Sequence, residues 1–367
     1  MTGSDPRIDS VEAAVYEVPT DAPEGDGTLS WDKTTVVTVT VRAGGRQGLG
    51  WTYAAGAAAR LIDDMLADAV AGRSATDPRG ANEAMARAVR NAGRPGVAAT
   101  AISAVDVALW DLHARLHDLP LHRELGGPDA PVMVYGSGGF TTYDDRQTTE
   151  QVCDWLERCG VAAVKIKVGE SWGSRPERDL SRVELVRGLV GAGHEVFVDA
   201  NGAYTVGQAI RLGRRFDDLG VSWFEEPVSS DDLAGLREVR HGIIADVAAG
   251  EYGYDLAYFE RMVSAGAVDC LQIDVTRCGG ITDFLRAAAV AAAHGLAVSA
   301  HCAPHLHASF VGVLPNLRHI EYFHDHTRIE EELLFDAVAA RDGRLRPVDA
   351  PGHGLALRPD AQRLRSK

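Results

Sequence analysis

The chain has 367 residues, which is enough for a barrel of about 250 residues and a second unit of about 100. Its formal net charge of −15 argues against nucleic acid and anionic membranes as partners, because both bind basic surfaces. The sequence has neither a signal-peptide pattern nor an apolar run of about 18 residues, so we expect a cytoplasmic protein that does not span a membrane. The five cysteines lack CxxC spacing, which argues against a disulfide framework or a zinc ribbon, and we interpret them as small apolar residues.

The first 130 residues predict an α+β unit, because strand patterns come first and helical patterns follow without alternation. Apolar and β-branched runs predict strands at 11–18, 34–41 and 47–53, and helical periodicity predicts helices at 57–71, 81–91 and 98–117. The last helix is apolar nearly all round, so we expect it to be buried. Residues 20–32 are predicted to form a polar loop that reaches over the active site together with Trp51 and Tyr53 and sets substrate choice.

From residue 131 onward the pattern alternates between strand and helix. Short apolar runs occur at 132–135, 162–164, 196–198, 221–224, 247–249, 271–273, 296–299 and 317–320. Eight such runs are the number that a closed (β/α)8 barrel, a modified TIM barrel, requires. We therefore expect a catalytic barrel at 131–330 and an α+β capping domain at 1–130. The eighth helix is weak, and residues 330–340 with the tail to 367 are expected to return to the capping domain, which the tail 331–367 would complete.

Polar residues follow these runs at intervals of about one strand-helix unit. They are Lys165, Lys167, Asp199, Glu225, Glu251, Asp274, His301 and Glu321. Because a parallel barrel carries its chemistry on the C-terminal ends of its strands, these side chains are predicted to converge on one mouth. The spacing therefore indicates a single active site.

Three of these residues are carboxylates at the ends of consecutive strands: Asp199, Glu225 and Glu251. Carboxylates so placed either hold a divalent cation or repel one another and acquire raised pKa values. Ligation by oxygen alone suits Mg²⁺, with Mn²⁺ as a substitute. The alternative interpretation is a set of ordinary salt bridges to arginine or lysine on the barrel rim.

Two further pairs suit proton transfer. Lys165 and Lys167 lie two apart on one strand and therefore point to the same side. We expect each lysine to depress the pKa of the other, and a nearby metal to depress both. Asp274 precedes His301 by one strand, and a carboxylate that accepts from one imidazole nitrogen raises the basicity of the other. Taken singly, such a lysine pair is commonly solvated and such a histidine is commonly a core residue. Their shared phase favours catalysis.

The combined motifs resemble those of the enolase superfamily, mandelate racemase subgroup, over nearly the whole chain. The matching segments are Lys-Ile-Lys at 165–167, Asp-Ala-Asn-Gly at 199–202, Trp-Phe-Glu-Glu-Pro at 223–227, Ala-Gly-Glu at 249–251, Asp-Val-Thr-Arg-Cys-Gly-Gly at 274–280, His301 and Glu321. The resemblance implies that a Mg²⁺-dependent enzyme abstracts the α-proton of a carboxylate substrate and gives an enediolate that the metal stabilises.

The resemblance also implies a role for each residue of the motifs. Asp199, Glu225 and Glu251 would bind one Mg²⁺ per subunit, and Lys165 would donate to the substrate carboxylate. Lys167 and His301, the latter oriented by Asp274, would exchange the α-proton from opposite faces. Glu321 would be protonated and would donate to the enediolate, and Asn201 would contact the substrate.

Dehydration of a sugar acid is the first expectation for the overall reaction. The resemblance favours acid sugars, and the polar loop at 20–32 suits a hydroxylated substrate, although Trp31, Trp51 and Tyr53 would equally suit an apolar one. Racemisation or epimerisation and cycloisomerisation of a hydroxy acid or a sugar-acid lactone are the alternatives. A non-catalytic barrel protein and a metal-dependent aldolase fit the residues less well. The resemblance implies assembly into a homo-oligomer, from a dimer to an octamer.

Overall fold

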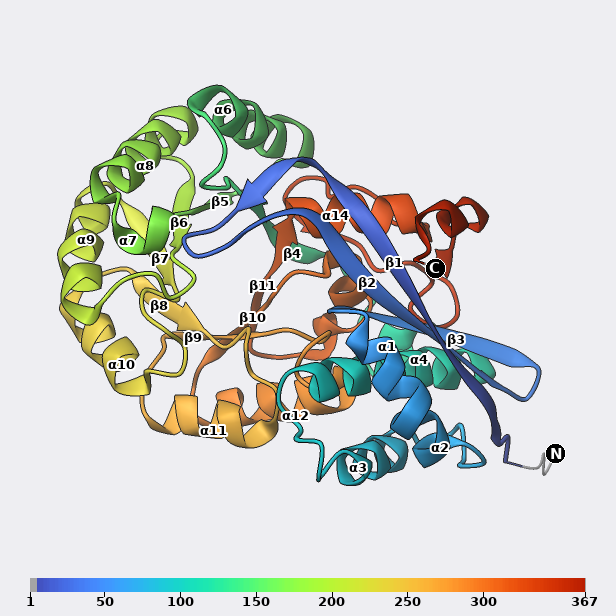
Figure 1. Ribbon diagram of the computed structural model, residues 1–367. Helices are drawn as coiled ribbons and strands as arrows, with labels where there is room; N and C mark the ends of the chain where they lie inside the picture. Colours follow the sequence, from blue (N-terminus) through green and yellow to red (C-terminus); the bar gives the residue numbers. More distant parts are fainter. Residues whose placement is uncertain (1–4, 367) are drawn as a thin grey trace.

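The N-terminal part of the chain forms a three-stranded antiparallel sheet followed by helices (Figure 1). In the computed structural model, which describes residues 5–366, the strands are β1 (Ile8–Gly25), β2 (Ser30–Ala43) and β3 (Arg46–Tyr53). The helices are α1 (Ala57–Leu61), a π-helical turn (Ile62–Leu66), α2 (Ala67–Val70), α3 (Pro78–Ala88), α4 (Val97–Leu116) and α5 (Leu121–Glu124). The predicted order of strands and then helices is confirmed.

The segment 20–32, predicted to be a loop, is mostly a β-hairpin. The β1–β2 ladder is irregular between Pro19 and Glu24 and then resumes, with Glu24 opposite Trp31 and Gly25 opposite Ser30. The turn is fixed by Asp26, whose Oδ1 accepts hydrogen bonds from the backbone N–H groups of Thr28 (2.6 Å) and Leu29 (2.8 Å). The prediction of a loop was wrong because the polar and proline residues cause an irregularity in the ladder and do not end it.

Helix α4 is the buried helix of this unit, as its apolar sequence predicted. Sixteen of its twenty residues are buried between the sheet and the barrel. Within residues 5–366 it is the one helix long and apolar enough to cross a membrane, but 94% of the relevant window is buried inside the protein. Its hydrophobicity is therefore that of a core helix.

Eight parallel strands close into a barrel, as expected. They are β4 (Val132–Gly138), β5 (Ala163–Lys167), β6 (Glu195–Asp199), β7 (Val221–Glu225), β8 (Asp246–Ala249), β9 (Cys270–Ile273), β10 (Ala297–Ala300) and β11 (Leu317–Phe323). Each strand pairs with the next along the chain, and β11 pairs with β4 to close the ring.

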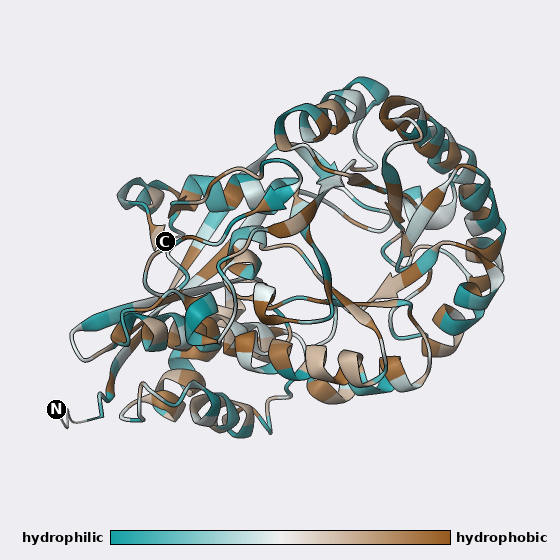
Figure 2. Cartoon of the chain, turned by 180° about the vertical axis from the view of Figure 1, so that it is seen from behind, coloured by the Kyte–Doolittle hydropathy of each residue, from teal (hydrophilic) through white to brown (hydrophobic). Residues whose placement is uncertain are grey.

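Helices surround the barrel, with hydrophobic residues toward the strands and hydrophilic residues outward (Figure 2). They are α6 (Asp145–Asp154), α7 (Glu170–Gly173), α8 (Pro176–Val190), α9 (Val206–Asp218), α10 (Leu233–Gly242), α11 (Leu256–Ser264), α12 (Gly280–Ala293), α13 (Pro304–Ala308) and α14 (His324–Leu333). Aspartates start several of them: Asp144, Asp232 and Asp255 each accept from the backbone N–H three residues ahead. The eighth helix, which the sequence indicates only weakly, is α14 and ends at Leu333.

The tail contacts both the capping unit and the barrel. Its short strands are β12 (Leu334–Phe335), β13 (Arg344–Leu345), which pairs with β4, and β14 (Ala356–Leu357), which pairs with β12. Beyond them, Ser366 N–H donates to the carbonyl of Val15 in β1 (2.9 Å), and Leu121 N–H donates to the carbonyl of Gly352 (2.7 Å). The division into 1–130 with 331–367 and 131–330 stays a prediction, and the β13–β4 pair shows that the tail also belongs to the barrel wall.

Candidate active site

The inward-facing residues of the barrel form an aromatic layer with a charged layer above it. Because side chains two apart on a strand share a face, the interior residue Phe197 precedes Asp199, Trp223 precedes Glu225 and His319 precedes Glu321. The rings of Phe197 and Trp223 stack with centroids 5.5 Å apart, and that of His319 lies 5.3 Å from Trp223. The aromatic layer closes the barrel below the site, so the charged groups lie only at the C-terminal ends of the strands.

Both lysines of β5 form ion pairs with carboxylates of the neighbouring strands. Lys165 Nζ lies 2.6 Å from Glu225 and 2.7 Å from Glu321, and Lys167 Nζ pairs closely with Asp199. Burial disfavours the charged amino groups, but these carboxylates outweigh it and raise the pKa of both lysines. The expectation of depressed lysine pKa values beside a bound metal stays a prediction, because here the carboxylates predicted to ligate that metal face the lysines directly.

Glu225 is positioned by two further donors. Trp223 Nε1 donates to its Oε2 (3.0 Å), and Gln272 Nε2 donates to the same oxygen (3.1 Å). Burial raises the pKa of Glu225 to about 8, although Lys165 opposes this shift. Its orientation is thus fixed by the aromatic layer and by β9.

His301 and Asp274 form the predicted dyad. Nδ1 of His301 lies 2.8 Å from Asp274 Oδ2, and its Nε2 lies 3.0 Å from Glu251 Oε2. Although burial favours neutral imidazole, the neighbouring acidic groups outweigh it and raise the pKa of His301. Arg277 contacts both carboxylates, at 3.1 Å from Glu251 and 3.4 Å from Asp274. Arg277 is thus a second cation beside His301, and it bridges the carboxylates that follow β8 and β9.

Glu321 accepts hydrogen bonds in this structure, and its expected role as a protonated donor to the enediolate stays a prediction. Ser137 Oγ donates to its Oε1 (2.6 Å) and Cys302 N–H donates to its Oε2 (3.1 Å). Burial acts to raise its pKa, but Lys165, His301 and Lys167 outweigh burial and lower it. The three buried cationic groups around Glu321 thus favour its carboxylate form.

The three predicted substrate contacts lie in different surroundings. Asn201 follows β6 with φ of 45°, and its buried Oδ1 has no hydrogen-bond partner within residues 5–366, which suits a ligand contact. Tyr53 Oη donates to Glu330 (3.2 Å) and its ring stacks on His326, 3.4 Å between centroids. Trp51 is 2% exposed and packs against His353 of the tail. The buried Nε1 of Trp51 has no hydrogen-bond partner within residues 5–366, and its contact with the substrate stays a prediction.

Residues beyond the predicted set also belong to the mouth. Cys302, which we expected to be a bystander, has its Sγ 3.3 Å from His301 Nε2. Glu226 is buried beside Glu225, and burial followed by the charge of Glu251 raises its pKa. Glu226 and Cys302 both adopt left-handed φ values, 38° and 54°, as Asn201 does. Such strained backbone at strand ends is typical of functional sites. In the sequence, only the adjacency of Glu226 and Cys302 to predicted site residues could have indicated them.

The β1–β2 hairpin covers this mouth, as predicted for residues 20–32 (Figure 1). Its tip, Gly27, is so close to the ends of β5 and β6 that an added Cβ would lie 2.8 Å from the Val168 carbonyl oxygen and 2.9 Å from that of Ala200. The Gly27 carbonyl accepts from Trp172 N–H (2.8 Å). Trp31, from the same hairpin, packs edge-on against Phe140 at the end of β4.

Three carboxylates are close enough to share one cation. Asp199, Glu225 and Glu251 are buried, and each offers an oxygen within 4.8 Å of the others. Oxygen ligands from carboxylates suit Mg²⁺ better than they suit the softer transition metals. The residues present therefore fit a hard divalent cation.

Comparison with known proteins gives the same family for both parts of the chain. Residues 10–126 match the mandelate racemase / muconate lactonizing enzyme N-terminal domain, and residues 147–361 match the enolase C-terminal domain-like family. A mandelate racemase/muconate lactonizing enzyme-like protein from Rubrobacter xylanophilus is 45% identical, with a TM-score of 0.94 over 98% of this chain and 100% of that chain.

Two relatives have names that describe reactions. The 3,6-anhydro-α-L-galactonate cycloisomerase of Streptomyces coelicolor is 32% identical over 97% of this chain and 98% of its own length. The L-talarate/galactarate dehydratase of Salmonella typhimurium, solved with Mg and L-lyxarohydroxamate, is 27% identical with a TM-score of 0.91 over 99% of this chain and 94% of that one. The chain belongs to the mandelate racemase and muconate lactonizing enzyme family of the enolase superfamily.

Proposed function

We propose that this enzyme dehydrates a sugar acid by first removing the proton α to its carboxylate. The observation that carries the proposal is the buried contact network in which Lys165, Lys167 and the His301–Asp274 dyad meet at one barrel mouth. Removal of a weakly acidic α-proton needs both a base and strong stabilisation of the developing negative charge, and this mouth offers cations for that purpose. The relatives include a talarate/galactarate dehydratase, which supports a hydroxylated acid as the substrate.

Each residue has a distinct proposed role. Lys165 donates to the substrate carboxylate, and Lys167 or His301 takes the α-proton, depending on the configuration of the substrate. Asp274 holds His301 in one tautomer through the 2.8 Å hydrogen bond to Nδ1, so Nε2 faces the substrate. His301 then protonates the β-hydroxyl as it leaves, and Glu321, protonated in the complex, donates a hydrogen bond to an enediolate oxygen. Asn201 and Tyr53 are candidate contacts to the rest of the sugar chain.

Mg²⁺ is the proposed cofactor, one per subunit, with Mn²⁺ as a substitute, and Asp199, Glu225 and Glu251 would hold it. When bound, it supplies positive charge beside the substrate carboxylate. The cations that now face these carboxylates would then be free to face the substrate. We further propose a cytoplasmic homo-oligomer, between a dimer and an octamer, without nucleic-acid or membrane partners.

Cycloisomerisation is the second candidate. The Streptomyces coelicolor relative, which the chain matches over nearly its full length, is named as a cycloisomerase. The same proton abstraction serves both reactions, since only the β-substituent that leaves differs: a hydroxyl group in dehydration, a ring oxygen in cycloisomerisation. The residues of the mouth support the shared step, and racemisation would follow if the proton were returned on the other face.

A screen of mono- and diacid sugars and their anhydro and lactone forms, with Mg²⁺ present, tests the reaction type. Mass spectrometry separates the outcomes, because the product of dehydration is lighter than the substrate by one water, whereas an isomeric product has the same mass as the substrate. We expect loss of water from at least one sugar acid, and loss of all activity when the divalent cation is chelated. Turnover that survives exhaustive chelation would contradict the proposal, and an isomeric product alone would select the second candidate.

Solvent deuterium exchange tests the assignment of the two bases. Lys167→Ala should lose α-proton exchange for substrates that present the proton to the lysine, whereas His301→Asn should lose it for those that present it to the histidine. Each loss should be about 10²–10⁴-fold, the usual contribution of a general acid-base group. NMR of the α-carbon position measures it, with the exposed Lys33→Ala as control and Mg²⁺ calorimetry to verify the metal site. Equal residual exchange in the two variants would contradict the face-specific roles.

A further inference from the structure

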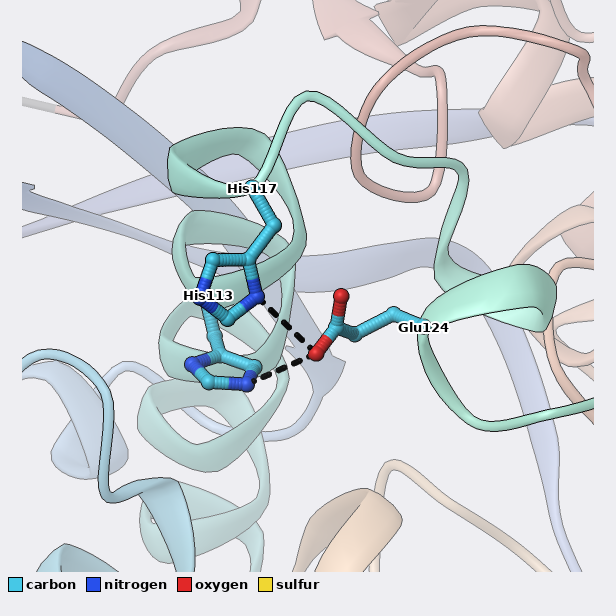
Figure 3. Close-up of side chains that lie close together, drawn as sticks. All are labelled: His113, His117 and Glu124. Atoms are coloured by element: carbon cyan, nitrogen blue, oxygen red, sulfur yellow. Dashed lines mark hydrogen bonds and ion pairs between the residues drawn. The ribbon is translucent and has the colours of Figure 1, made fainter.

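Two histidines and a glutamate converge at the C-terminal end of α4, outside the barrel mouth (Figure 3). His113 lies in the last turn of α4 and His117 follows as its C-cap, while Glu124 ends α5. His113 Nε2 and His117 Nδ1 each lie 3.0 Å from the same oxygen, Oε1 of Glu124. This cluster has no role in the proposed reaction or in the contact between the capping unit and the barrel.

The spacing and chemistry of the cluster are those of a metal site. Histidines at i and i+4 share one helix face, an arrangement that recurs in zinc sites together with a carboxylate. All three ligand atoms lie within 4.8 Å of one another. Zinc bonds of about 2.0–2.2 Å in a tetrahedron place ligand atoms roughly 3.4 Å apart, so each nitrogen would move only a few tenths of an ångström away from the Glu124 oxygen.

The second nitrogen of His113 supports this assignment. When Nε2 carries the proton and donates to Glu124, the buried Nδ1 has no hydrogen-bond partner among the residues that the structure describes. The backbone of Ala75 lies close to the His113 ring, and because the Ala75 N–H already donates to Pro6, its carbonyl is the group available. A metal on Nε2 would move the proton to Nδ1, where that carbonyl can accept it, which is how ligating histidines are commonly oriented.

The surroundings leave one side of the cluster open. The side chains of His113 and Glu124 are 12% and 13% exposed, whereas that of His117 is 44% exposed. Three protein ligands with an open position leave room for a water molecule or another ligand. The position is also mechanically significant, because α5 lies in the segment that connects the capping unit to β4.

We propose that His113, His117 and Glu124 form a second metal site, for Zn²⁺ or a similar first-row transition ion, which ties the end of α4 to α5. Two nitrogen donors and one oxygen donor select such ions over Mg²⁺, whereas the carboxylates of the barrel mouth have the opposite preference. The two sites are thus expected to hold different metals in the same subunit.

Zinc stoichiometry of the full-length protein tests the proposal. Because Zn²⁺ can also enter the barrel site, each variant is titrated after removal of metals, with a chromophoric chelator as competitor and an excess of Mg²⁺. We expect His117→Ala and Glu124→Gln to bind one equivalent fewer than the wild type, or to weaken that equivalent by at least the 10–100-fold that loss of an outer-shell partner costs. The matched control is His294→Ala, which changes an exposed histidine that is likewise the C-cap of a helix, α12.

Co²⁺ absorption and thermal unfolding complete the test. A four-coordinate Co²⁺ band should appear in the wild type and His294→Ala and be absent from His117→Ala. In an excess of Mg²⁺, which occupies the barrel site, Zn²⁺ should raise the unfolding midpoint of the first two proteins only. Circular dichroism in chelator verifies that each variant is folded. Identical zinc stoichiometry and midpoint shifts in His117→Ala and His294→Ala would overturn the proposal, as would a wild type whose bound Zn²⁺ is entirely displaced by Mg²⁺.

Discussion

The protonation states at the barrel mouth follow from how its charges are paired. Five carboxylates, Asp199, Glu225, Glu251, Asp274 and Glu321, face four cationic groups, Lys165, Lys167, His301 and Arg277. A divalent cation bound there would give these carboxylates a partner other than the lysines and His301. The residue types therefore suit the proposed chemistry, and the lysines acquire depressed pKa values only when they no longer face these carboxylates.

A buried glutamate of the hairpin gives a test of protonation that is independent of catalysis. Glu24 is fully buried, accepts from Trp31 Nε1 (3.0 Å), and burial followed by the charge of Asp325 raises its pKa to about 9. Because the folded state keeps this proton and the unfolded state releases it, the stabilisation is complete below about pH 4.5 and declines as the pH rises to about 9.

Glu24→Gln keeps the shape of the side chain but does not titrate. Its unfolding free energy should therefore increase relative to that of the wild type as the pH rises. Between pH 5 and 8 the difference in unfolding free energy should grow by up to about 4 kcal/mol. Thermal unfolding midpoints of both proteins across this range measure it. Glu17→Gln, an exposed position on the same strand, is the control, and parallel pH curves for Glu24→Gln and the wild type would show that Glu24 is ionised in the folded protein.

The identity of the charged residues could be predicted from the sequence, but their protonation could not. The recurrence of Asp199, Glu225 and Glu251 after apolar runs is a local pattern, and strand phase alone brings their side chains together. The lowered pKa of Glu321 depends on Lys165 and His301, which lie far from it in the sequence. Similarly, the burial of Trp51 depends on His353 of the tail, a contact that no local pattern indicates.

At the scale of elements, the strand-helix alternation predicted the barrel. The segment that covers it, 20–32, was predicted to be a loop and is a hairpin. A hairpin and a loop share the same polar composition at 20–32, and only pairing across the turn, Glu24 with Trp31, distinguishes them. The hairpin is positioned by its contacts with the loop that follows β4. The carbonyl of Gly25 accepts from Thr141 N–H (2.8 Å), and the carbonyl of Asp26 accepts from Thr141 Oγ1 (2.6 Å). It is thus a rigid cover whose tip is fixed by the barrel.

Gly27→Ala should lift this cover. The added methyl would meet three backbone carbonyls, of Val168, Gly169 and Ala200, none of which can turn aside as a side chain could. Displacement of the tip by about 1 Å should lower kcat/KM by about 10–100-fold with the substrate found in the screen. Mg²⁺ affinity should be unchanged, since the tip does not contact the carboxylates.

The control for this variant is Gly188→Ala, in helix α8, where an added Cβ meets nothing within 4 Å. It should leave kcat/KM unchanged and stabilise the protein slightly, because alanine favours helix more than glycine does. Increased acrylamide quenching of hairpin tryptophan fluorescence in Gly27→Ala would verify the opening. Wild-type kcat/KM in Gly27→Ala would mean that the tip does not control access to the mouth.

At the scale of the whole molecule, α4 holds the sheet, the barrel and the tail together through two buried aspartates. Asp106 accepts from the N–H (3.0 Å) and Oγ1 (2.7 Å) of Thr282 at the start of α12. Asp111 accepts from the N–H groups of Leu49 in β3 and His353 in the tail, both at 2.8 Å. A helix that is otherwise apolar thus carries its few charges where it must satisfy backbone donors of other elements.

Asp111→Ala should therefore release the tail. The substitution leaves the buried N–H groups of Leu49 and His353 without acceptors, at a cost of about 1–3 kcal/mol for each unsatisfied group. The tail should become the first site of limited proteolysis, with cleavage near residue 350 well below the unfolding midpoint, followed by mass spectrometry of the fragments. The matched control is Asp129→Ala, which removes an exposed ion pair to Arg346 of the same tail (3.3 Å), a contact worth at most about 1 kcal/mol. If both variants resist protease as the wild type does, the other contacts of the tail, such as the β13–β4 pair, are sufficient to hold it, and α4 does not organise the molecule in this way.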